Sequence, residues 1–324
     1  MQSLRMLCAA IAFLVPASMS LALADSWPTR AIQVISPFTA GNANDIVARV
    51  VLDQLSKQIN QSIVIENRPG GGGTIGASMV AKADPDGYTL LIHSSSFSAA
   101  MVLHKNLPYD TLRDFAPVIL FGIQPSVLVS APSKGFSSVA DLVAAAKVKP
   151  GALNYASAGI GSASHMAAER LRLSTGIDAQ HIPFRGPVEA FTEVMSGRID
   201  FYFLPIAPAL PVIGEGKVVA LAVSTPTRAP NLPNVPTTAE AGYPEAAYLF
   251  WGGLFAPAKT PRAVVSKLHD EARKALNVPV VQERLAKVGV QPMPLSLEQF
   301  EQFFRADVAS TLKLAKDIGL VPTN

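Results

Sequence analysis

The sequence predicts an α/β protein of two lobes, in which parallel sheets are covered by helices. Short apolar, β-branched segments alternate with helical patterns along the chain, and 324 residues suffice for about two domains of roughly 150 residues each. The regular pattern is interrupted twice, near residues 122–126 and at 224–244. With 49% hydrophobic and 16% charged residues, the composition also excludes a disordered, collagenous or coiled-coil chain.

A strand–loop–helix order repeats from the start of this pattern. Residues 31–36 are an expected strand, and the helix expected over 45–58 places one apolar face toward a core, formed by Ile46, Val47, Val50, Val51 and Leu55. The next expected elements are a strand at 62–66, a helix from about 75, strands at 89–93 and 153–156, and a helix at 163–174. Units of this length favour parallel strands joined by helical crossovers.

The two interruptions predict where the chain passes between lobes. Gly122 and Pro125 break a strand pair, and five prolines between 224 and 244 favour an extended connection over packed helix or sheet. We therefore expect a discontinuous first lobe of residues 25–124 and 245–324 and a second lobe of residues 125–244. Two crossing strands make a hinge, and the cleft between two such lobes is a natural ligand site.

The C-terminal part of the chain is predicted to be strongly helical. Thr260 is expected to cap a helix whose first residue is Pro261, and Ser296 with Gln299 forms a capping-box pattern. The helix that follows this box is expected to stop at Gly319.

The first 24 residues are typical of an export signal. Arg5 precedes an apolar run at 6–15, Pro16 ends the run, and small residues at 22–24 predict cleavage after Ala24 and a periplasmic location. A membrane anchor is the alternative, but the run is far shorter than the roughly 20 residues a spanning helix needs. Cleavage would also remove Cys8, the only cysteine, which suits an oxidising compartment.

Charge and motif content argue against several other classes. The net charge is +3 without runs of like charge, so nucleic acid is not an expected partner. Residues 71–76 match G-x-G-x-x-G, but the acid expected about 20 residues downstream is absent, so a tight loop explains them better than a dinucleotide site. The five histidines are scattered, so no metal and no cofactor is expected.

Two turns built of small residues form the candidate ligand site. Residues 36–45 and 155–165 each lead from an expected strand into a helix, where free N–H groups and the helix dipole favour an anion. One such turn in each half suggests a pincer on a carboxylate; ordinary strand-to-helix turns are the alternative. The expected contacts are Phe38, Thr39, Ala40, Gly41, Asn42, Asn44, Ser157, Gly159, Gly161, Ser162, Ser164 and His165.

Arg185 is a further candidate, because it lies between an expected strand at 180–183 and a helix at 187–196. There its guanidinium could face the cleft as a bidentate carboxylate partner, and a solvated surface arginine is equally open. Ser162 with His165 allows a second interpretation, an exported hydrolase acting on a carboxylate ester. No G-x-S-x-G motif supports it, and His165 is better explained as a hydrogen-bonding residue at a helix start.

Many ordered motifs resemble one family, the Bug-type substrate-binding receptors of tripartite tricarboxylate transporters. The resemblance spans nearly all of the chain after residue 24 and includes Pro37-Phe38, Asp45-Ile46-Val47-Ala48-Arg49, Glu66-Asn67-Arg68-Pro69-Gly70, Pro85-Asp86-Gly87-Tyr88, Asn154-Tyr155-Ala156-Ser157, Ser164-His165 and Ala239-Glu240-Ala241-Gly242.

The resemblance implies a periplasmic binding fold of the Venus-flytrap type that closes on its ligand without catalysis. It implies a small organic carboxylate as ligand, gripped by turns that match residues 37–44 and 157–164 through backbone N–H groups and water. The implied partners are the large and small membrane subunits of a transporter, and we expect the receptor to be a monomer.

One position departs from the pattern of family members that bind amino acids. Such members often carry an acid in the segment that matches Phe203-Leu204-Pro205, where it would meet the ligand's ammonium. An ammonium buried against Leu204 would stay unpaired, at a cost of several kcal/mol, and Phe203 beside it is a further expected contact of the ligand. The sequence therefore favours a plain or aromatic mono- or dicarboxylate over an amino acid.

Overall fold

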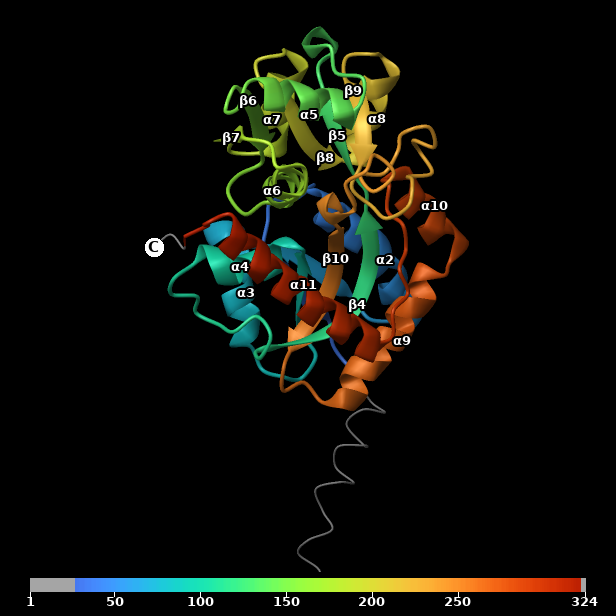
Figure 1. The fold of residues 1–324 in the computed structure, drawn as a ribbon. Coiled ribbons are helices and arrows are strands. Elements are labelled where there is room, and N and C mark those ends of the chain that lie inside the picture. Colours follow the sequence, from blue (N-terminus) through green and yellow to red (C-terminus); the bar gives the residue numbers. More distant parts are fainter. Residues whose placement is uncertain (1–26, 322–324) are drawn as a thin grey trace, which may run out of the picture.

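Two lobes make up the computed structural model, which describes residues 27–321 (Figure 1). The first lobe contains β1 (Ile32–Ser36), β2 (Ile63–Asn67), β3 (Thr89–Ser94), β4 (Phe115–Gln124) and β10 (Phe250–Pro257). The second contains β5 (Ser126–Ser130), β6 (Leu153–Ser157), β7 (Ala179–Pro183), β8 (Phe201–Pro205) and β9 (Val219–Val223). The predicted signal peptide, residues 1–24, lies outside the described residues.

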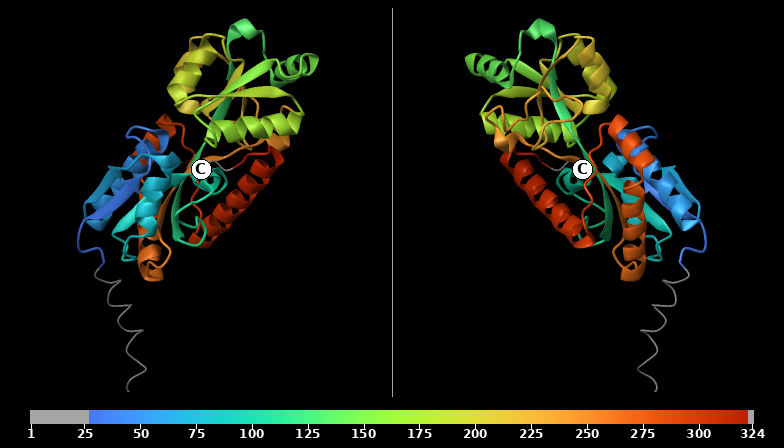
Figure 2. Two further views of the ribbon diagram at one scale, coloured as in Figure 1. Left: turned by 90° about the vertical axis from the view of Figure 1, so that its left-hand side faces the viewer. Right: turned by 90° about the vertical axis from the view of Figure 1, so that its right-hand side faces the viewer.

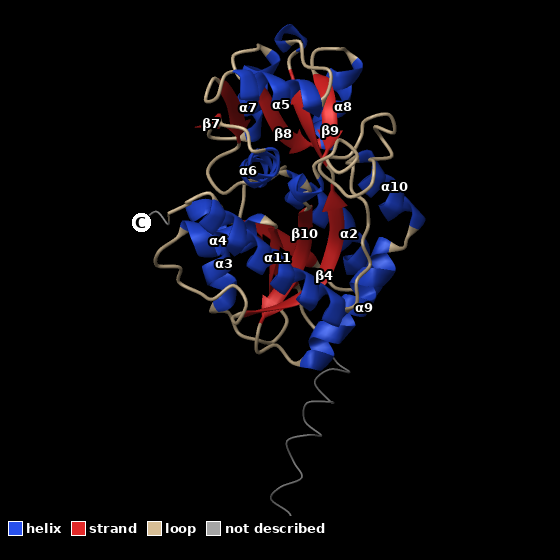
Figure 3. Cartoon of the chain, in the orientation of Figure 1, coloured by secondary structure: helices blue, strands red, loops and turns tan. Residues whose placement is uncertain are grey.

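Helices lie around both sheets (Figure 3). Those of the first lobe are α2 (Ala43–Ile59), α3 (Thr74–Ala81), α4 (Ser96–Leu103), α9 (Arg262–Leu276), α10 (Pro279–Lys287) and α11 (Leu297–Asp317). Those of the second are α5 (Val139–Val148), α6 (Ala163–Thr175), α7 (Pro187–Met195) and α8 (Ile206–Gly214). Short 3₁₀ turns are η1 (Gly71–Gly73), η2 (Pro132–Lys134) and η3 (Pro244–Ala246). No helix within residues 27–321 has the length and apolar character needed to cross a bilayer.

Strand direction brings the ends of both sheets to one boundary. The strand orders are β2-β1-β3-β10-β4 and β7-β6-β8-β5-β9, and β10 is antiparallel to both β3 and β4. Strands β1, β2 and β3 therefore run with β4, which continues through Pro125 into the second lobe (Figure 1). In that lobe β8 is antiparallel to β5, and β6 and β7 run with β8. The carboxyl ends of β1 and β6 thus face each other across the boundary between the lobes.

The first-lobe core fills both faces of its sheet. Helices α2 and α9 cover an aliphatic face, and α3, α4 and α11 cover an aromatic one around Trp251, Phe255 and Phe304. Each large side chain buried in this way contributes about 1.5–3 kcal/mol. The expected apolar face of α2 is confirmed except for Ile46, which is 39% exposed. Ile46 lies on the far side of the helix from Ala48, because two residues span more than half a turn.

Helix ends agree with the capping patterns with one correction. Ser296 and Gln299 form the expected capping box at the start of α11. At α9, however, Pro261 is itself the N-cap residue, with extended backbone, and helical geometry begins one residue later than predicted. Thr260 makes no cap, and its buried hydroxyl has no partner among the described residues.

The chain returns from the second lobe to the first slightly later in the sequence than predicted. Residues 224–249, all within the described part of the chain, contain η3 as their regular element, in keeping with an extended connection. Ala246 and Tyr248 still pack in a second-lobe core cluster, so the crossing falls between Tyr248 and β10 rather than at residue 245. The end of α11 also reaches this cluster through Leu314, and Figure 2 shows that helix rising from the first lobe toward the second.

Candidate functional site

The first-lobe turn is fixed by the residues that begin α2. Asn42 is the N-cap, and its Oδ1 accepts the backbone N–H groups of Asn44 at 2.9 Å and of Asp45 at 3.2 Å. Asparagine is among the best N-cap residues because its side chain satisfies amides that the helix itself leaves free. Asn44 is buried against β10, and a Cβ at Gly252 would lie 2.7 Å from its Oδ1. The glycine therefore makes room for the helix start.

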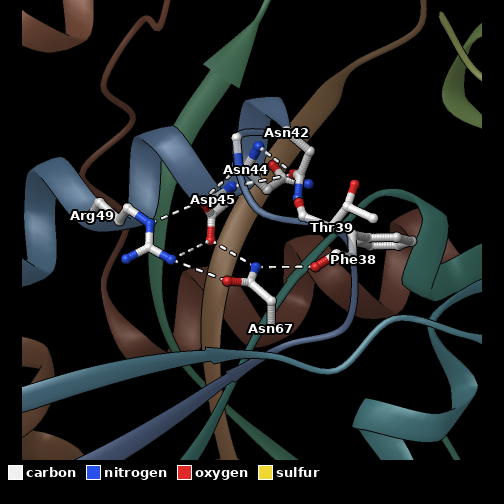
Figure 4. A network of polar contacts seen from close by, with 8 residues as sticks. Phe38, Thr39, Asn42, Asn44, Asp45, Arg49 and Asn67 are labelled. Atoms are coloured by element: carbon white, nitrogen blue, oxygen red, sulfur yellow. Dashed lines mark hydrogen bonds and ion pairs between the residues drawn. The ribbon is translucent and has the colours of Figure 1, made fainter.

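A buried carboxylate ties this turn to the neighbouring strand (Figure 4). Asp45 accepts the N–H of Gly41 at 2.9 Å, Nε of Arg49 at 2.9 Å and Nδ2 of Asn67 at 2.9 Å. Asn67 also donates to the carbonyl of Phe38 at 3.0 Å. Burial disfavours the charged form, but the bonds from Arg49, Gly41 and Asn67 outweigh it and hold the pKa of Asp45 below its usual range.

The second-lobe turn has an analogous construction from hydroxyl groups. Ser162 caps α6, its Oγ accepting the N–H of His165 at 3.3 Å, and Ser164 Oγ accepts the N–H of Ala158 at 3.0 Å. Ser157 Oγ accepts the N–H of Gly159 at 3.1 Å. The hydroxyls of Ser157, Ser162 and Ser164 thus accept backbone amides of the turn itself.

Both turns leave backbone donors at the lobe boundary. Within the described residues, several amides of each turn have no protein acceptor: those of Phe38, Thr39, Ala40 and Ala43 in the first lobe and of Ile160, Ala163 and Ser164 in the second. Such amides at a helix start carry the partial positive charge of the helix dipole. The arrangement offers an anion neutral donors from both sides.

Strand ends add polar groups that the sequence analysis did not select. Ser36 and Gln124 are the last residues of β1 and β4, and His93 is the last but one of β3; each has a buried polar atom that lacks a partner among the described residues. His93 stacks on Phe97 at 4.3 Å between ring centroids and meets the edge of Phe38 at 5.5 Å. Burial lowers the pKa of His93 to about 3, so the ring is neutral. In the sequence, a polar residue at the end of an otherwise apolar strand could have identified these three positions as candidate site residues.

Arg185 lies at the carboxyl end of β7, on the boundary side of the second sheet. Its backbone N–H donates to Glu189 at 3.3 Å, and its exposed guanidinium has no acceptor within the described residues. The guanidinium is therefore available to an incoming carboxylate.

Phe203 and Leu204 are core residues, which corrects the expectation that they face the ligand. Both are buried, to 0% and 2% exposure. Phe203 packs on the side of α5 and α6, and Leu204 packs with Ala190 and Phe191 of α7. Because every side chain near the end of β8 is apolar, the sequence does not indicate which face of the strand borders a ligand site. In the structure both faces of β8 pack in the core. The argument against amino-acid ligands loses its support at this position.

The geometry also speaks against the hydrolase interpretation. His165 Nδ1 accepts the N–H of Gly161 at 3.1 Å, and its Nε2 faces Glu169 at 3.9 Å. Ser162 Oγ shares a hydrogen bond with Ser164 at 3.0 Å. Neither nitrogen of His165 is in position to take a proton from Ser162, as a serine nucleophile would require.

Fold and site together define the architecture of a two-lobed solute-binding protein, with free backbone amides of both turns at the boundary between the lobes. The sequence profile described as "Tripartite tricarboxylate transporter family receptor" matches residues 47–320. The chain therefore belongs to this receptor family, as the motifs had indicated, and it is a periplasmic solute receptor rather than an enzyme.

Individual relatives are similar along most of their length. The chain is 37% identical over 297 residues to the UPF0065 protein in the tcbD-tcbE intergenic region of Pseudomonas sp. strain P51, covering 91% of this chain and 88% of the relative. Rpa4515 of R. palustris, solved with adipate, superposes with a TM-score of 0.82 at 32% identity, covering 92% and 100% of the two chains. MatC of Rhodopseudomonas palustris, solved with bound malate, gives 0.77 at 32% identity, covering 89% and 99%.

Proposed function

We propose that this receptor captures a small dicarboxylate between residues 37–44 and 157–164 and delivers it to the membrane subunits of a tripartite transporter. The observation that carries the proposal is the pair of facing helix starts, each with several backbone amides that have no protein acceptor. The structural relatives solved with adipate and malate, both dicarboxylates, support the ligand class. Residues 1–24 would direct export and be removed by cleavage after Ala24, and the mature protein would act as a monomer.

Charge at the boundary supports a plain acid over an amino acid. Asp45 is the acid in the first turn, but its side chain is 2% exposed and paired with Arg49. It is therefore not available to an ammonium group. Arg185 supplies an unpaired cation at the second-lobe edge, which suits a second carboxylate.

Calorimetric titration with adipate, malate and their monocarboxylate counterparts tests the proposal. Arg185→Ala should cost about 2–5 kcal/mol for a dicarboxylate, because the second carboxylate would lose its charged partner, and much less for a monocarboxylate. Arg305→Ala, on the exposed side of α11, is the matched control and should leave affinity unchanged. Equal losses for both ligand types would show that Arg185 does not contact the second carboxylate. Absence of binding to any of these acids would overturn the ligand class.

A further inference from the structure

Two histidines stack directly behind the second-lobe turn. The rings of His165, from α6, and His181, from β7, lie 4.0 Å apart between centroids with an interplanar angle of 16°. Tyr155 of β6 continues the stack at 5.0 Å from His181, and Phe201 of β8 follows at 5.5 Å from Tyr155. Strands and helix thus hold the two imidazoles in one fixed orientation.

Each imidazole makes a hydrogen bond to a different end of the turn. Nδ1 of His165 accepts the backbone N–H of Gly161 at 3.1 Å. Nε2 of His181 lies 2.6 Å from Oγ of Ser157, and that oxygen accepts the N–H of Gly159. Because a backbone N–H only donates, Nδ1 of His165 must be unprotonated in this arrangement.

The surroundings keep both rings neutral near neutral pH. Burial lowers the pKa of His165, opposed by Glu169 and assisted by Arg172, both on the same helix. Burial, with His165 beside it, lowers the pKa of His181 to about 4. Glu169 is itself held by Arg172 at 2.8 Å and by the hydroxyl of Tyr155. These are the charged and titratable groups that α6, β6 and β7 present to the pair.

We propose that His165 and His181 are positioning residues for ligand binding: as a neutral stacked pair they fix the backbone of residues 157–161, and protonation of His165 releases it. The inference rests on the proposed function for the identity of the ligand. The hydrogen bonds between the histidines and the turn, however, are present in the protein without ligand. A proton on Nδ1 would oppose the N–H of Gly161, donor against donor. A second proton, on His181, would add repulsion between two stacked cations.

Amide exchange of the ligand-free protein tests the device without any ligand. The exchange rates of the Gly159 and Gly161 amides are measured by NMR as the pH is lowered, together with the imidazole signals of both histidines. We expect protection of Gly161 to fall in step with protonation of His165. Unchanged protection of Gly161 through that titration would overturn the proposal.

Two pairs of variants separate positioning from mere packing. His165→Asn places an acceptor oxygen near the position of Nδ1 and does not titrate, whereas His165→Leu removes the acceptor; His181→Gln and His181→Leu form the corresponding pair. Each leucine variant should bind adipate about tenfold more weakly at neutral pH, and the amide variants should stay close to the wild type.

Comparison at one acidic pH removes the ligand's own ionisation from the result. There His165→Asn should bind adipate more tightly than the wild type, because its acceptor persists. Wild-type affinity in both leucine variants, or equal acid sensitivity in wild type and His165→Asn, would show that the stack is only core. The two proposals can fail separately. If neither the wild type nor any variant binds a carboxylate, but the exchange protection of the Gly161 amide still falls as His165 is protonated, the proposed function fails and the positioning role stands.

Discussion

The backbone N–H of Gly41 donates to the carboxylate of Asp45 at 2.9 Å, so an acid inside the protein occupies a donor of the first-lobe turn. Together with Arg49 and Asn67, this carboxylate holds the turn from within (Figure 4). Under the proposed function, the amides of Thr39, Ala40 and Ala43 would be left for the ligand. This division lets a helix start keep its shape before any ligand arrives.

Asp45→Asn should destabilise the protein by about 1–3 kcal/mol, because Arg49 loses its charged partner while the shape of the side chain is kept. Urea unfolding at neutral pH measures the change. Asp53→Asn, in the same helix, is the control: its pair with Lys57 is exposed on both sides and should contribute at most about 0.5 kcal/mol. Equal effects of the two substitutions would contradict a structural role for Asp45.

The same pair of variants predicts a pH dependence. The pKa of Asp45 is lowered in the folded protein, so its contribution is fully present above the unfolded value of 3.8 and is lost as the pH falls through the folded pKa. The difference in unfolding free energy between wild type and Asp45→Asn should therefore be constant from pH 7 to about 5 and shrink in stronger acid. A difference that grows on acidification would have the wrong sign.

Gly161 marks a contact between the lobes that can be tested against a matched glycine. It has φ +73°, and a Cβ there would lie 2.1 Å from Cδ1 of Leu103 in α4 of the other lobe. Gly176 has φ +66°, and a Cβ at that position would have no neighbouring atom within 4 Å. Gly176→Ala should cost only the backbone strain of about 1–2 kcal/mol, and Gly161→Ala should cost more and weaken ligand binding.

The double variant Gly161→Ala with Leu103→Ala checks the cause. Removing most of the Leu103 side chain should restore the ligand affinity that Gly161→Ala loses, with calorimetry as the measurement. Affinity that stays low would place the effect in the turn itself rather than in the contact between lobes.

The sequence predicted what depends on local pattern. Strand and helix positions, the capping box at Ser296 and the two strand-to-helix turns all follow from spacing and residue type within a short window. Contacts between distant residues had no such signal: Asn67 reaches Asp45 across 22 positions and His181 reaches Ser157 across 24. These pairs exist because neighbouring parallel strands bring their ends together, a consequence of sheet order that the local pattern does not contain.

For Leu204 the local sequence pattern was misleading: it suggested a residue that faces the ligand, whereas the structure places this side chain in the core. The expected effect of substituting it therefore changes. Because Leu204 packs among Val127, Ala190 and Phe191 in the second-lobe core, Leu204→Asp should unfold that core rather than repel an anionic ligand. We expect a loss of stability of about 3–5 kcal/mol, measured by thermal and urea unfolding. Leu204→Met, which keeps volume and polarity, should cost less than about 1.5 kcal/mol and leave ligand affinity unchanged.

Arg170 joins the lobes behind the site and predicts how they move. From α6 its guanidinium donates to Ser310 of α11 at 2.5 Å and to the carbonyl of Ala247, beside the return crossing, at 3.2 Å. The backbone itself passes between the lobes at Pro125 and after Tyr248, and two such crossings suit a hinge.

Small-angle scattering measures the motion directly. A saturating dicarboxylate should reduce the radius of gyration of the wild type, since neither lobe alone surrounds a ligand. Arg170→Ala should enlarge the ligand-free protein, because the tie between α6 and α11 is lost, while the liganded form keeps the wild-type radius. Arg305→Ala, which removes a cation from the exposed side of the same helix α11, should change neither form. A wild-type radius that does not respond to bound ligand would contradict closure of the lobes, and an unchanged ligand-free Arg170→Ala would show that this arginine does not restrain them.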